Sequence, residues 1–487
     1  MHANFLTATT LLATVASAAP FNSSNLPADE ATRFSLIYGF PLIPFAKSAG
    51  DTMSITNATN KYYHMREIAG PLDQSIVRPN VDTLYSAAVI DLSHSDIVID
   101  IPSIDNDRYW IYPFYDLYAN NFANIGSTTN GTAGKYLVRY DPSKSKEIGV
   151  HLCSHIADRG ADEGCDGYDG YINAPTPYGQ LIARFEATNN STDFDTIHQL
   201  QNKSTIHLAA RSRLGDATAP RLGPNMLNSS TYSGDIPTRI MQMLARFAPY
   251  NPPRNISDLP RVNRMLNTAG IDKGHYKSQV RNLTAVAQAA AQKVGVAFNQ
   301  PQNVMNLTHD WQMIAPAAQG EYSTNYDMRA FMANWGYLAL TAQESLYPMY
   351  AGDGDTLELG ADEAYIFTFS GKPPVMKQGF WSLTAYNAQK YLIENTRDQY
   401  SVSDRSGLTY SDGMPVYGDD AGKQTQFQVL VQPADKEPPK NWTSNWLPAP
   451  AGGGQFDLTL RFYAPEDELK NGSWEFPVVQ KHKAITE

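Results

Sequence analysis

Apolar and polar residues alternate strictly along residues 456–463, near the C-terminal end of the chain. The apolar positions are Phe456, Leu458, Leu460 and Phe462. The intervening positions are Asp457, Thr459, Arg461 and Tyr463. Because successive side chains of a strand point to opposite faces, this pattern predicts a strand with one buried face and one polar face.

Similar short runs recur in the last third of the chain, with turn-forming residues between them. We expect strands at residues 365–369, 380–386 and 427–431 as well. Several strands of this length suggest an antiparallel sandwich or jelly roll. The C-terminal part of the chain is therefore predicted to be a β-sandwich module.

The region between about residues 84 and 138 also contains short runs, which are rich in Val, Ile and Tyr. Asp, Asn, Ser, Gly and Pro residues separate these runs. They predict strands at residues 97–101, 109–112 and 135–138. An N-terminal β-rich module is the simplest interpretation.

Between these two regions the apolar residues recur with a period near 3.6, which is typical of helices. We expect helices at residues 236–247, 278–298 and 326–346. A shorter helical pattern at residues 30–37 is followed by Pro41 and Pro44, which prevent its continuation. The central helices are expected to brace the β modules.

The predicted fold class is therefore α+β, mainly β. The chain of 487 residues is long enough for several cores. We divide it into a signal peptide at residues 1–18, an N-terminal β-rich module at 19–190, a helical connecting region at 191–346 and a C-terminal module at 347–487.

The first 18 residues have the form of a secretory leader. An apolar run over residues 5–15 is followed by Ala16-Ser17-Ala18, a small-x-small cleavage pattern. The run is too short to cross a bilayer, and no later stretch is long and apolar enough to do so. We expect a secreted, extracellular protein without a membrane span.

Numerous Asn-x-Ser/Thr sequons agree with export and predict a glycosylated surface. The expected sites are Asn22, Asn57, Asn130, Asn190, Asn202, Asn228, Asn255, Asn282, Asn306, Asn441 and Asn471. Asn189 also begins a sequon, but a glycan on one of two adjacent asparagines would block the other.

The chain has two cysteines, Cys153 and Cys165, in a Gly- and Asp-rich stretch. In an oxidising compartment we expect them to form a disulfide bond. His151 and His155 lie beside Cys153, so a zinc site is an alternative. We favour the disulfide because the spacing matches no common zinc finger and the protein is expected to be secreted. No metal site and no cofactor are assigned.

The formal net charge of −11 argues against nucleic acid and anionic membranes as partners. The sequence contains no Gly-x-Ser-x-Gly elbow, no His-Glu-x-x-His and no phosphate-binding or dinucleotide-binding glycine motif. These absences count against common serine hydrolases, zincins and dinucleotide enzymes. A carboxylate pair assembled from distant segments would leave no local trace.

Residues 78–86 concentrate polar side chains around Pro79, between two segments that are expected to be structured. Arg78 and Asp82 can form an ion pair, and Asn80 and Thr83 can close a side-chain-to-backbone turn. Tyr85 can begin the strand that follows. A purely structural role and a ligand site both fit this segment.

The chain resembles two families that occur together, domain of unknown function 1254 and domain of unknown function 1214. The first is matched by residues 78–85, 91–92, 108–110, 120–122 and 126. The second is matched by residues 379–386, 395, 400–401, 412–413, 445–450 and 461–465. The resemblance implies a β-sandwich-like C-terminal module and no particular activity.

Two functions from different classes remain open. The protein could be an enzyme that acts on a small molecule or glycan in a cleft between modules. In that case Asp82 is the acid or base, Arg78 holds an anionic group or sets the pKa of the carboxyl group, and Tyr85 donates a hydrogen bond. Substitution of Asp82 by Asn should then abolish turnover and leave thermal stability unchanged.

Alternatively, the protein is a non-enzymatic extracellular binder of carbohydrates or small ligands. Trp381, Tyr386 and Trp446 would then supply aromatic contact area. We assign Asn80 and Arg461 to the ligand-binding residues together with these three.

Overall fold

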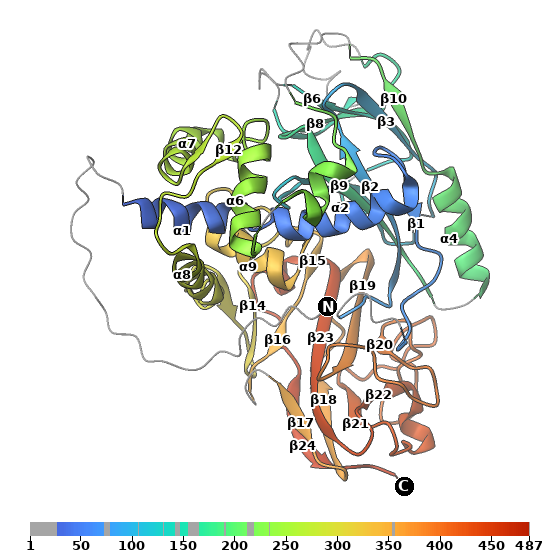
Figure 1. Ribbon diagram of the computed structural model, residues 1–487. Coiled ribbons are helices and arrows are strands. Elements are labelled where there is room, and N and C mark those ends of the chain that lie inside the picture. The colour runs from blue at the N-terminus through green and yellow to red at the C-terminus, as the bar shows by residue number, and fades with distance from the viewer. Residues whose placement is uncertain are drawn as a thin grey trace.

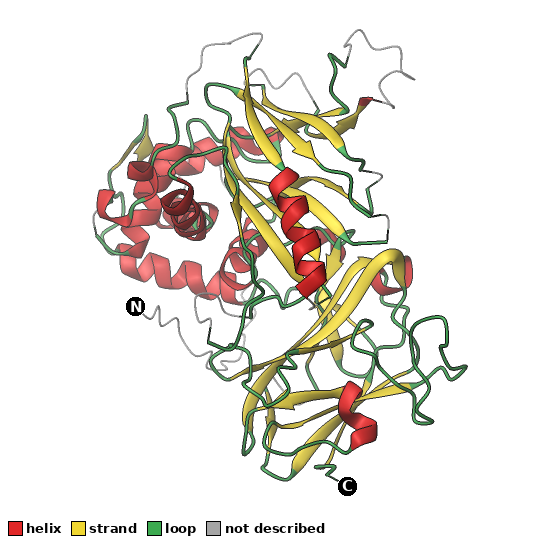
Figure 2. Cartoon of the chain, turned by 90° about the vertical axis from the view of Figure 1, so that its right-hand side faces the viewer, coloured by secondary structure: helices red, strands yellow, loops and turns green. Residues whose placement is uncertain are grey.

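The fold was examined in a computed structural model. The structure describes residues 27–72, 78–105, 107–129, 131–141, 147–153, 165–188, 191–211, 219–232, 234–352 and 356–486. Two β-rich bodies lie one above the other, and most of the helices gather on one side of the upper one (Figures 1 and 2). The predicted α+β, mainly β class is confirmed.

The upper body contains two five-stranded sheets. The first sheet has the strand order β1 (Tyr63–His64), β2 (Thr83–Asp91), β9 (Tyr178–Glu186), β4 (Trp110–Asp116), β5 (Asn121–Gly126). The second has the order β10 (Thr205–Ala209), β3 (Asp96–Ile101), β6 (Gly134–Tyr140), β8 (Gly170–Ala174), β7 (Gly149–Leu152). The strands predicted at 97–101, 109–112 and 135–138 correspond to β3, β4 and β6.

The two sheets enclose one hydrophobic core. Alternate residues of the first sheet, such as Leu84, Phe114 and Phe185, meet Ile97 and Ile99 of the second. Helix α4 (Ser191–Lys203) adds Ile197 and Leu200 to this core. One face of the first sheet is therefore buried within the upper body.

The opposite face of the first sheet is also buried, against the lower body. Tyr109, Ile111 and Tyr115 share a core there with Phe380 and Tyr463, which lie far along the chain. Because both faces are covered, polar side chains on this second face must find partners or cost folding free energy. The candidate site lies on this face.

The helices cluster against the first sheet, whose Val89 and Tyr178 join their core. The members of this cluster are α1 (Ala28–Gly39), α2 (Leu42–Thr56), α5 (Pro224–Leu227), α6 (Ile236–Phe247), α7 (Leu259–Thr268), α8 (Leu283–Gly295) and α9 (Tyr326–Trp335). Helix α1 packs on α6, α7, α8 and α9, so these helices share a core although α1 and α2 precede the first sheet in sequence.

Two of the three central helices are shorter than the sequence predicts. Helix α6 has the expected bounds, whereas α8 is shorter at both ends. Helix α9 ends at Trp335 rather than at residue 346, because Gly336 stops it in a non-helical conformation. The next residues run across the first sheet, where Leu338 and Leu340 join its buried second face.

The lower body contains two further sheets around a common core. One has the order β15 (Ser345–Leu346), β23 (Gly454–Pro465), β19 (Val375–Asn387), β20 (Ser401–Ser403), and β17 (Leu357–Leu359) also pairs with β23. The other has the order β22 (Trp446–Ala449), β21 (Phe427–Pro433), β18 (Glu363–Phe369), β24 (Val478–Lys483). The β21–β22 pair is parallel and the others are antiparallel. The four predicted C-terminal strands are confirmed as β18, β19, β21 and β23, whereas a jelly-roll-like sandwich stays a prediction.

The smaller elements complete the chain. They are the hairpin of β11 (Ile271–Asp272) and β12 (His275–Tyr276), the sheet of β13 (Val304–Asn306), β14 (Trp311–Ile314) and β16 (Met349–Tyr350), and the one-turn helix α10 (Asp467–Lys470).

The prediction that β23 has a polar, uncovered face is wrong. Phe456, Leu460 and Phe462 enter the core as expected, but Arg461 and Tyr463 on the opposite face are also buried. The upper body covers that face. The strict alternation was right about which residues share a face, and wrong about what covers the polar one.

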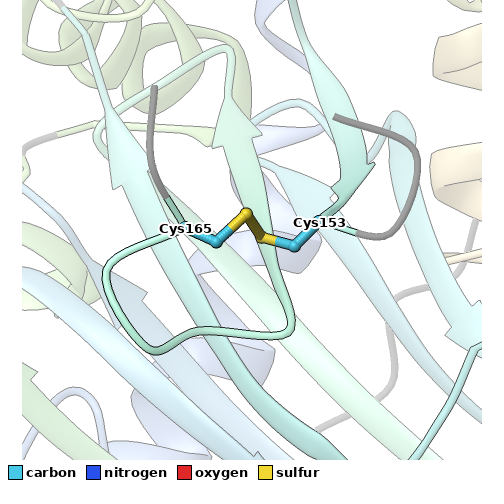
Figure 3. Close-up of a disulfide and its surroundings, with 2 residues drawn as sticks. All are labelled: Cys153 and Cys165. Atoms are coloured by element: carbon cyan, nitrogen blue, oxygen red, sulfur yellow. A yellow bond between two sulfur atoms is a disulfide. The ribbon is translucent and has the colours of Figure 1, made fainter. Parts of the chain in front are cut away.

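The disulfide between Cys153 and Cys165 is confirmed (Figure 3). It uses both thiols that a zinc site would need. It follows directly on β7, an edge strand of the second sheet, so it fixes a connection at the margin of the molecule. His155 lies outside the described residues.

Eight of the expected sequon asparagines lie within the described residues. Seven are exposed: Asn57, Asn202, Asn228, Asn282, Asn306, Asn441 and Asn471. Asn255 is half-buried. Asn22, Asn130, Asn190 and the leader at residues 1–18 lie outside the described residues. No helix in the described ranges combines the length and hydropathy that a membrane crossing requires.

Candidate functional site at the junction of the two bodies

Residues 78–85 run along the junction between the upper and lower bodies. The Asn80 side-chain oxygen accepts hydrogen bonds from the backbone N–H groups of Asp82 and Thr83, at 2.6 and 3.2 Å. This is the predicted Asx-type turn. It places Asp82 and Tyr85 at the start of β2, facing the lower body.

The expected ion pair between Arg78 and Asp82 is not formed. The Arg78 guanidinium lies 2.8 Å from the Asp457 carboxylate of β23, which the Lys390 ammonium also contacts at 2.5 Å. The Arg78 backbone N–H donates to the Lys390 carbonyl at 2.7 Å. Arg78 therefore connects the two bodies and is not free to hold a substrate.

Asp82 is 2% exposed, and both of its carboxylate oxygens have partners from the lower body. One accepts a hydrogen bond from the Ser382 hydroxyl at 2.6 Å, and the other contacts the Arg405 guanidinium at 3.0 Å. Arg405 also contacts Glu186 at 3.2 Å and donates to the Ala187 carbonyl at 2.9 Å. The expectation that Asp82 is a catalytic acid or base is corrected, since it serves as half of a buried ion pair.

Three carboxyl groups surround this one guanidinium: Asp82, Glu186 and Asp404. Burial raises the pKa of Asp404 to about 7, against the lowering effect of Arg405. Burial likewise raises the pKa of Glu186. One cation thus balances one buried and two half-buried acid groups at the junction.

The ligand-binding residues expected in the C-terminal module are also buried. The Trp381 indole N–H donates to the Tyr417 hydroxyl at 2.8 Å, and the Tyr386 hydroxyl donates to the Pro79 carbonyl at 2.8 Å. Trp446 packs in a core with no exposed surface. These rings have no face for a sugar or another ligand, so this assignment is corrected.

Arg461 is buried on the face of β23 that the upper body covers, so it lies at the junction. Its guanidinium donates to the hydroxyl groups of Thr384 at 2.9 Å and Tyr386 at 2.6 Å. Through Tyr386 it is linked to the Pro79 carbonyl, so Arg461 positions the segment before β2.

Arg184 is another guanidinium at the junction, and sequence reasoning missed it. It is 7% exposed and lies on β9, directly opposite Tyr85 of β2. It donates to the Tyr115 hydroxyl at 3.4 Å and to the Leu338 carbonyl at 3.3 Å. Its Nε has no hydrogen-bond partner, and no carboxylate among the described residues forms a salt bridge with it.

Five tyrosines gather around this cation, and we call the group the tyrosine–arginine cluster. Its members are Tyr85, Tyr109, Tyr115, Arg184, Tyr347 and Tyr463. Arg184 lies over the Tyr85 ring, 5.5 Å from its centre, and its charge acts on the other four phenols. Tyr85, Tyr115, Arg184 and Tyr463 lie on β2, β4, β9 and β23, whereas Tyr109 directly precedes β4 and Tyr347 directly follows β15.

The pKa values of the Tyr347 and Tyr463 phenols are shifted in opposite directions. Burial disfavours ionisation of Tyr347, but Arg184, followed by Ser345 and Tyr463, lowers its pKa below the usual value. Burial and the neighbouring Tyr347 raise the pKa of Tyr463. The Tyr463 hydroxyl also accepts a hydrogen bond from Asn80 at 2.6 Å. Two titratable groups with separated pKa values are the arrangement that proton-transfer sites use.

The cluster reaches solvent on one side. Tyr85, Tyr347 and Asn80 are half-buried. Beyond them, Trp335 at the end of α9 is 57% exposed, with the Arg78 guanidinium 5.4 Å from its ring centre. Tyr85 and Asn80, both predicted site residues, therefore lie together at this cluster. Asp82, the third, contacts Arg405 and Ser382 instead.

The alternation along β9 could have drawn attention to Arg184. Leu181, Ala183 and Phe185 are the apolar face of that strand, which leaves Ile182 and Arg184 on the other. Nothing in the sequence shows that this other face is buried by residues from the last third of the chain.

The comparisons with known proteins agree with the two bodies. The family model described as Protein of unknown function (DUF1254) matches residues 59–207, and that described as Protein of unknown function (DUF1214) matches residues 344–467. The chain is a DUF1254–DUF1214 protein. The DUF1254 domain supplies Tyr85 and Arg184, and the DUF1214 domain supplies Tyr347 and Tyr463, so the cluster lies between the two domains. The predicted pairing is confirmed.

The crystal structure of the VPA0106 protein from Vibrio parahaemolyticus is similar, with a TM-score of 0.60 and 17% identity. The match covers 93% of this chain and 99% of that one. This likeness shows that both domains and the helices occur together in one fold. The match to a solved structure of a protein from Burkholderia cenocepacia covers 94% of this chain and 95% of that one, with 10% identity and a TM-score of 0.42. The search of curated proteins returned no significant match.

Substitution of Arg405 by Met should lower the free energy of unfolding by about 3–5 kcal/mol, because it leaves buried carboxylates without their cation. Arg397→Met is the matched control, since Arg397 pairs with Glu437 in an exposed ion pair and should cost at most about 1 kcal/mol. Urea unfolding of both variants measures the difference. Equal losses in the two variants would contradict this account of the junction.

Substitution of Asp404 by Asn should stabilise the protein at pH 8 and leave it unchanged below about pH 4, the ordinary pKa of Asp in an unfolded chain. The folded-state pKa is raised to about 7, so the contribution of Asp404 is fully present below its unfolded pKa and is lost as the pH rises through about 7. Melting temperatures of the variant and the parent across this range test the prediction. Asp419→Asn, at an exposed position, is the control. If the melting temperature of Asp404→Asn depends on pH in the same way as that of Asp419→Asn, the prediction is wrong.

Proposed function

We propose that this protein is an extracellular enzyme that acts on a small organic anion bound in the tyrosine–arginine cluster between its two domains. The observation that carries the proposal is Arg184. A buried guanidinium without a counter-charge costs several kcal/mol of folding free energy, and proteins retain such groups where they serve a function. An anionic ligand would supply the missing charge and accept hydrogen bonds from the guanidinium.

The phenols around Arg184 support an enzymatic rather than a purely binding role. A buried anion beside several hydroxyl groups can exchange a proton with them, and Tyr347 has the lowered pKa that this exchange needs. The Asn80 amide fixes Tyr463 beside it. In this proposal Arg184 binds the anion, Tyr347 transfers the proton, and Tyr85 and Tyr463 orient the bound molecule.

The extracellular location rests on the leader-like first 18 residues and on the sequons, and the disulfide agrees with it. The alternative of a carbohydrate binder that uses exposed aromatic rings loses support, because Trp381, Tyr386 and Trp446 are buried.

Replacement of Arg184 by Met should leave stability unchanged or raise the free energy of unfolding by about 1–4 kcal/mol, as when other buried ionic groups are replaced by apolar side chains of similar size. Arg405→Met is the matched control, because Arg405 also lies at the junction, with 18% of its side chain exposed, but is surrounded by carboxylates. A loss for Arg184→Met as large as the loss for Arg405→Met would return Arg184 to a structural role.

The binding step is tested with thermal shifts of the parent in formate, acetate, benzoate and phosphate, beside acetamide and benzamide as uncharged controls. We expect at least one anion to stabilise the parent by about 2.7 kcal/mol at one hundred times its Kd, and to have no effect on Arg184→Met. If the anions and amides behave alike, or if Arg184→Met responds like the parent, the proposed site is wrong.

A further inference from the structure

Glu344 is a buried carboxyl group at the edge of the tyrosine–arginine cluster. It is 1% exposed and directly precedes β15. Its backbone N–H donates to the Thr341 carbonyl, and its own carbonyl accepts from the Ala464 N–H, both at 2.9 Å. These bonds hold Glu344 between the segment that follows α9 and strand β23.

The side chain of Glu344 has a neutral partner across the junction. The Thr128 hydroxyl, from the turn after β5, donates to one carboxyl oxygen at 2.6 Å. No lysine, arginine or histidine among the described residues forms a salt bridge with this carboxyl group. Glu344 is thus a buried acid without a paired cation, just as Arg184 is a buried cation without a paired acid.

Both groups face the same cluster. The charge of Glu344 acts on the Tyr109 phenol, and the charge of Arg184 acts on both Glu344 and Tyr109. The Tyr109 hydroxyl is buried and has no hydrogen-bond partner, so it is free to bond a ligand or the carboxyl group. Thr128, Tyr109 and Arg184 are the polar or charged groups that face Glu344.

A ligand anion changes the charge balance of this cluster. Before binding, the charge of Arg184 favours an ionised Glu344. After binding, the anion neutralises Arg184, and an ionised Glu344 would leave a net negative charge in a buried site. That state is costly, and protonation of the carboxyl group removes the cost.

We propose that Glu344 takes up one proton when an anion binds at Arg184, so that the site binds an anion together with a proton. The inference rests on the proposed function. In the protonated form the carboxyl group becomes a hydrogen-bond donor to the bound anion or to Tyr109. Glu344 is therefore a positioning residue for the ligand and makes binding dependent on pH.

Near neutral pH the carboxyl group is ready for this exchange. Burial raises the pKa of Glu344 to about 7, although the Thr128 hydrogen bond and Arg184 both lower it. A small change of charge at Arg184 then shifts the protonation of Glu344. The fold places an acid of suitable strength near Arg184, a buried cation with which no carboxylate of the described residues forms a salt bridge.

The test measures the affinity of the whole protein for acetate by isothermal titration calorimetry between about pH 6 and 9, where acetate stays ionised. In the parent, the affinity should fall about tenfold for each pH unit above 7, as expected for one proton taken up on binding. In Glu344→Gln, whose side chain is neutral at every pH, the affinity should not change with pH. Calorimetry in two buffers of different ionisation enthalpy should show one proton taken up by the parent and none by the variant.

Asp404→Asn is the matched control. Asp404 is another buried acid with a raised pKa at the junction, but it belongs to the Arg405 group, so its replacement should leave the pH dependence of acetate affinity intact. Thr128→Val removes the hydrogen bond that lowers the pKa of Glu344, and should move the onset of the affinity loss to higher pH. This second variant keeps the proposal testable if Glu344→Gln fails to fold.

The possible outcomes separate the two proposals. Acetate binding with a flat pH profile in the parent, or with the same slope in Glu344→Gln, overturns the coupling and leaves the anion site standing. If acetate, formate, benzoate and phosphate all fail to bind at every pH, the anion site is wrong and the coupling is overturned with it. A pH slope lost in Glu344→Gln and retained in Asp404→Asn establishes Glu344 as the proton-binding group.

Discussion

The insertion of Arg405 between Asp82 and Glu186 is the interaction on which the arrangement of the two domains depends. It joins the loop after β20 to the strands β2 and β9, and it balances carboxyl groups that could not remain ionised in a buried junction without a cation. It also explains why polar residues 78–86 are so dense. Most of that segment is used to connect the domains rather than to bind a ligand.

Two of the guanidinium groups at the junction, those of Arg405 and Arg184, have opposite surroundings. Arg405 is surrounded by carboxyl groups, whereas Arg184 is surrounded by phenols and lacks a counter-charge. The first arrangement stabilises the folded state, and the second costs free energy unless a ligand completes it. This contrast separates a structural site from a candidate functional one within the same interface, where residue type and burial alone would treat them as equal.

Stability and function are expected to depend on pH through different carboxyl groups in this interface. Asp404 and Glu344 both have pKa values raised by burial to about 7. Asp404 lies in the Arg405 group, which joins the domains, and Glu344 lies beside the cluster that is proposed to bind the anion. A change of pH around neutrality therefore acts on the attachment of the domains and on the ligand site separately, which allows the two effects to be measured in different variants.

The sequence by itself determined the class of fold, the disulfide, the pairing of the two domains, the helix at Ile236–Phe247 and several strands of each body. These features follow from local periodicity, turn residues and short motifs, which need no knowledge of distant contacts. It also identified the Asn80 turn. Tertiary structure alone decided that the polar face of β23 is buried, that Arg78 pairs with Asp457 rather than Asp82, and that Arg184 meets Tyr347 and Tyr463. Alternation tells which side chains share a face of a strand, but not which segment covers that face, because the covering segment lies hundreds of residues away in the chain.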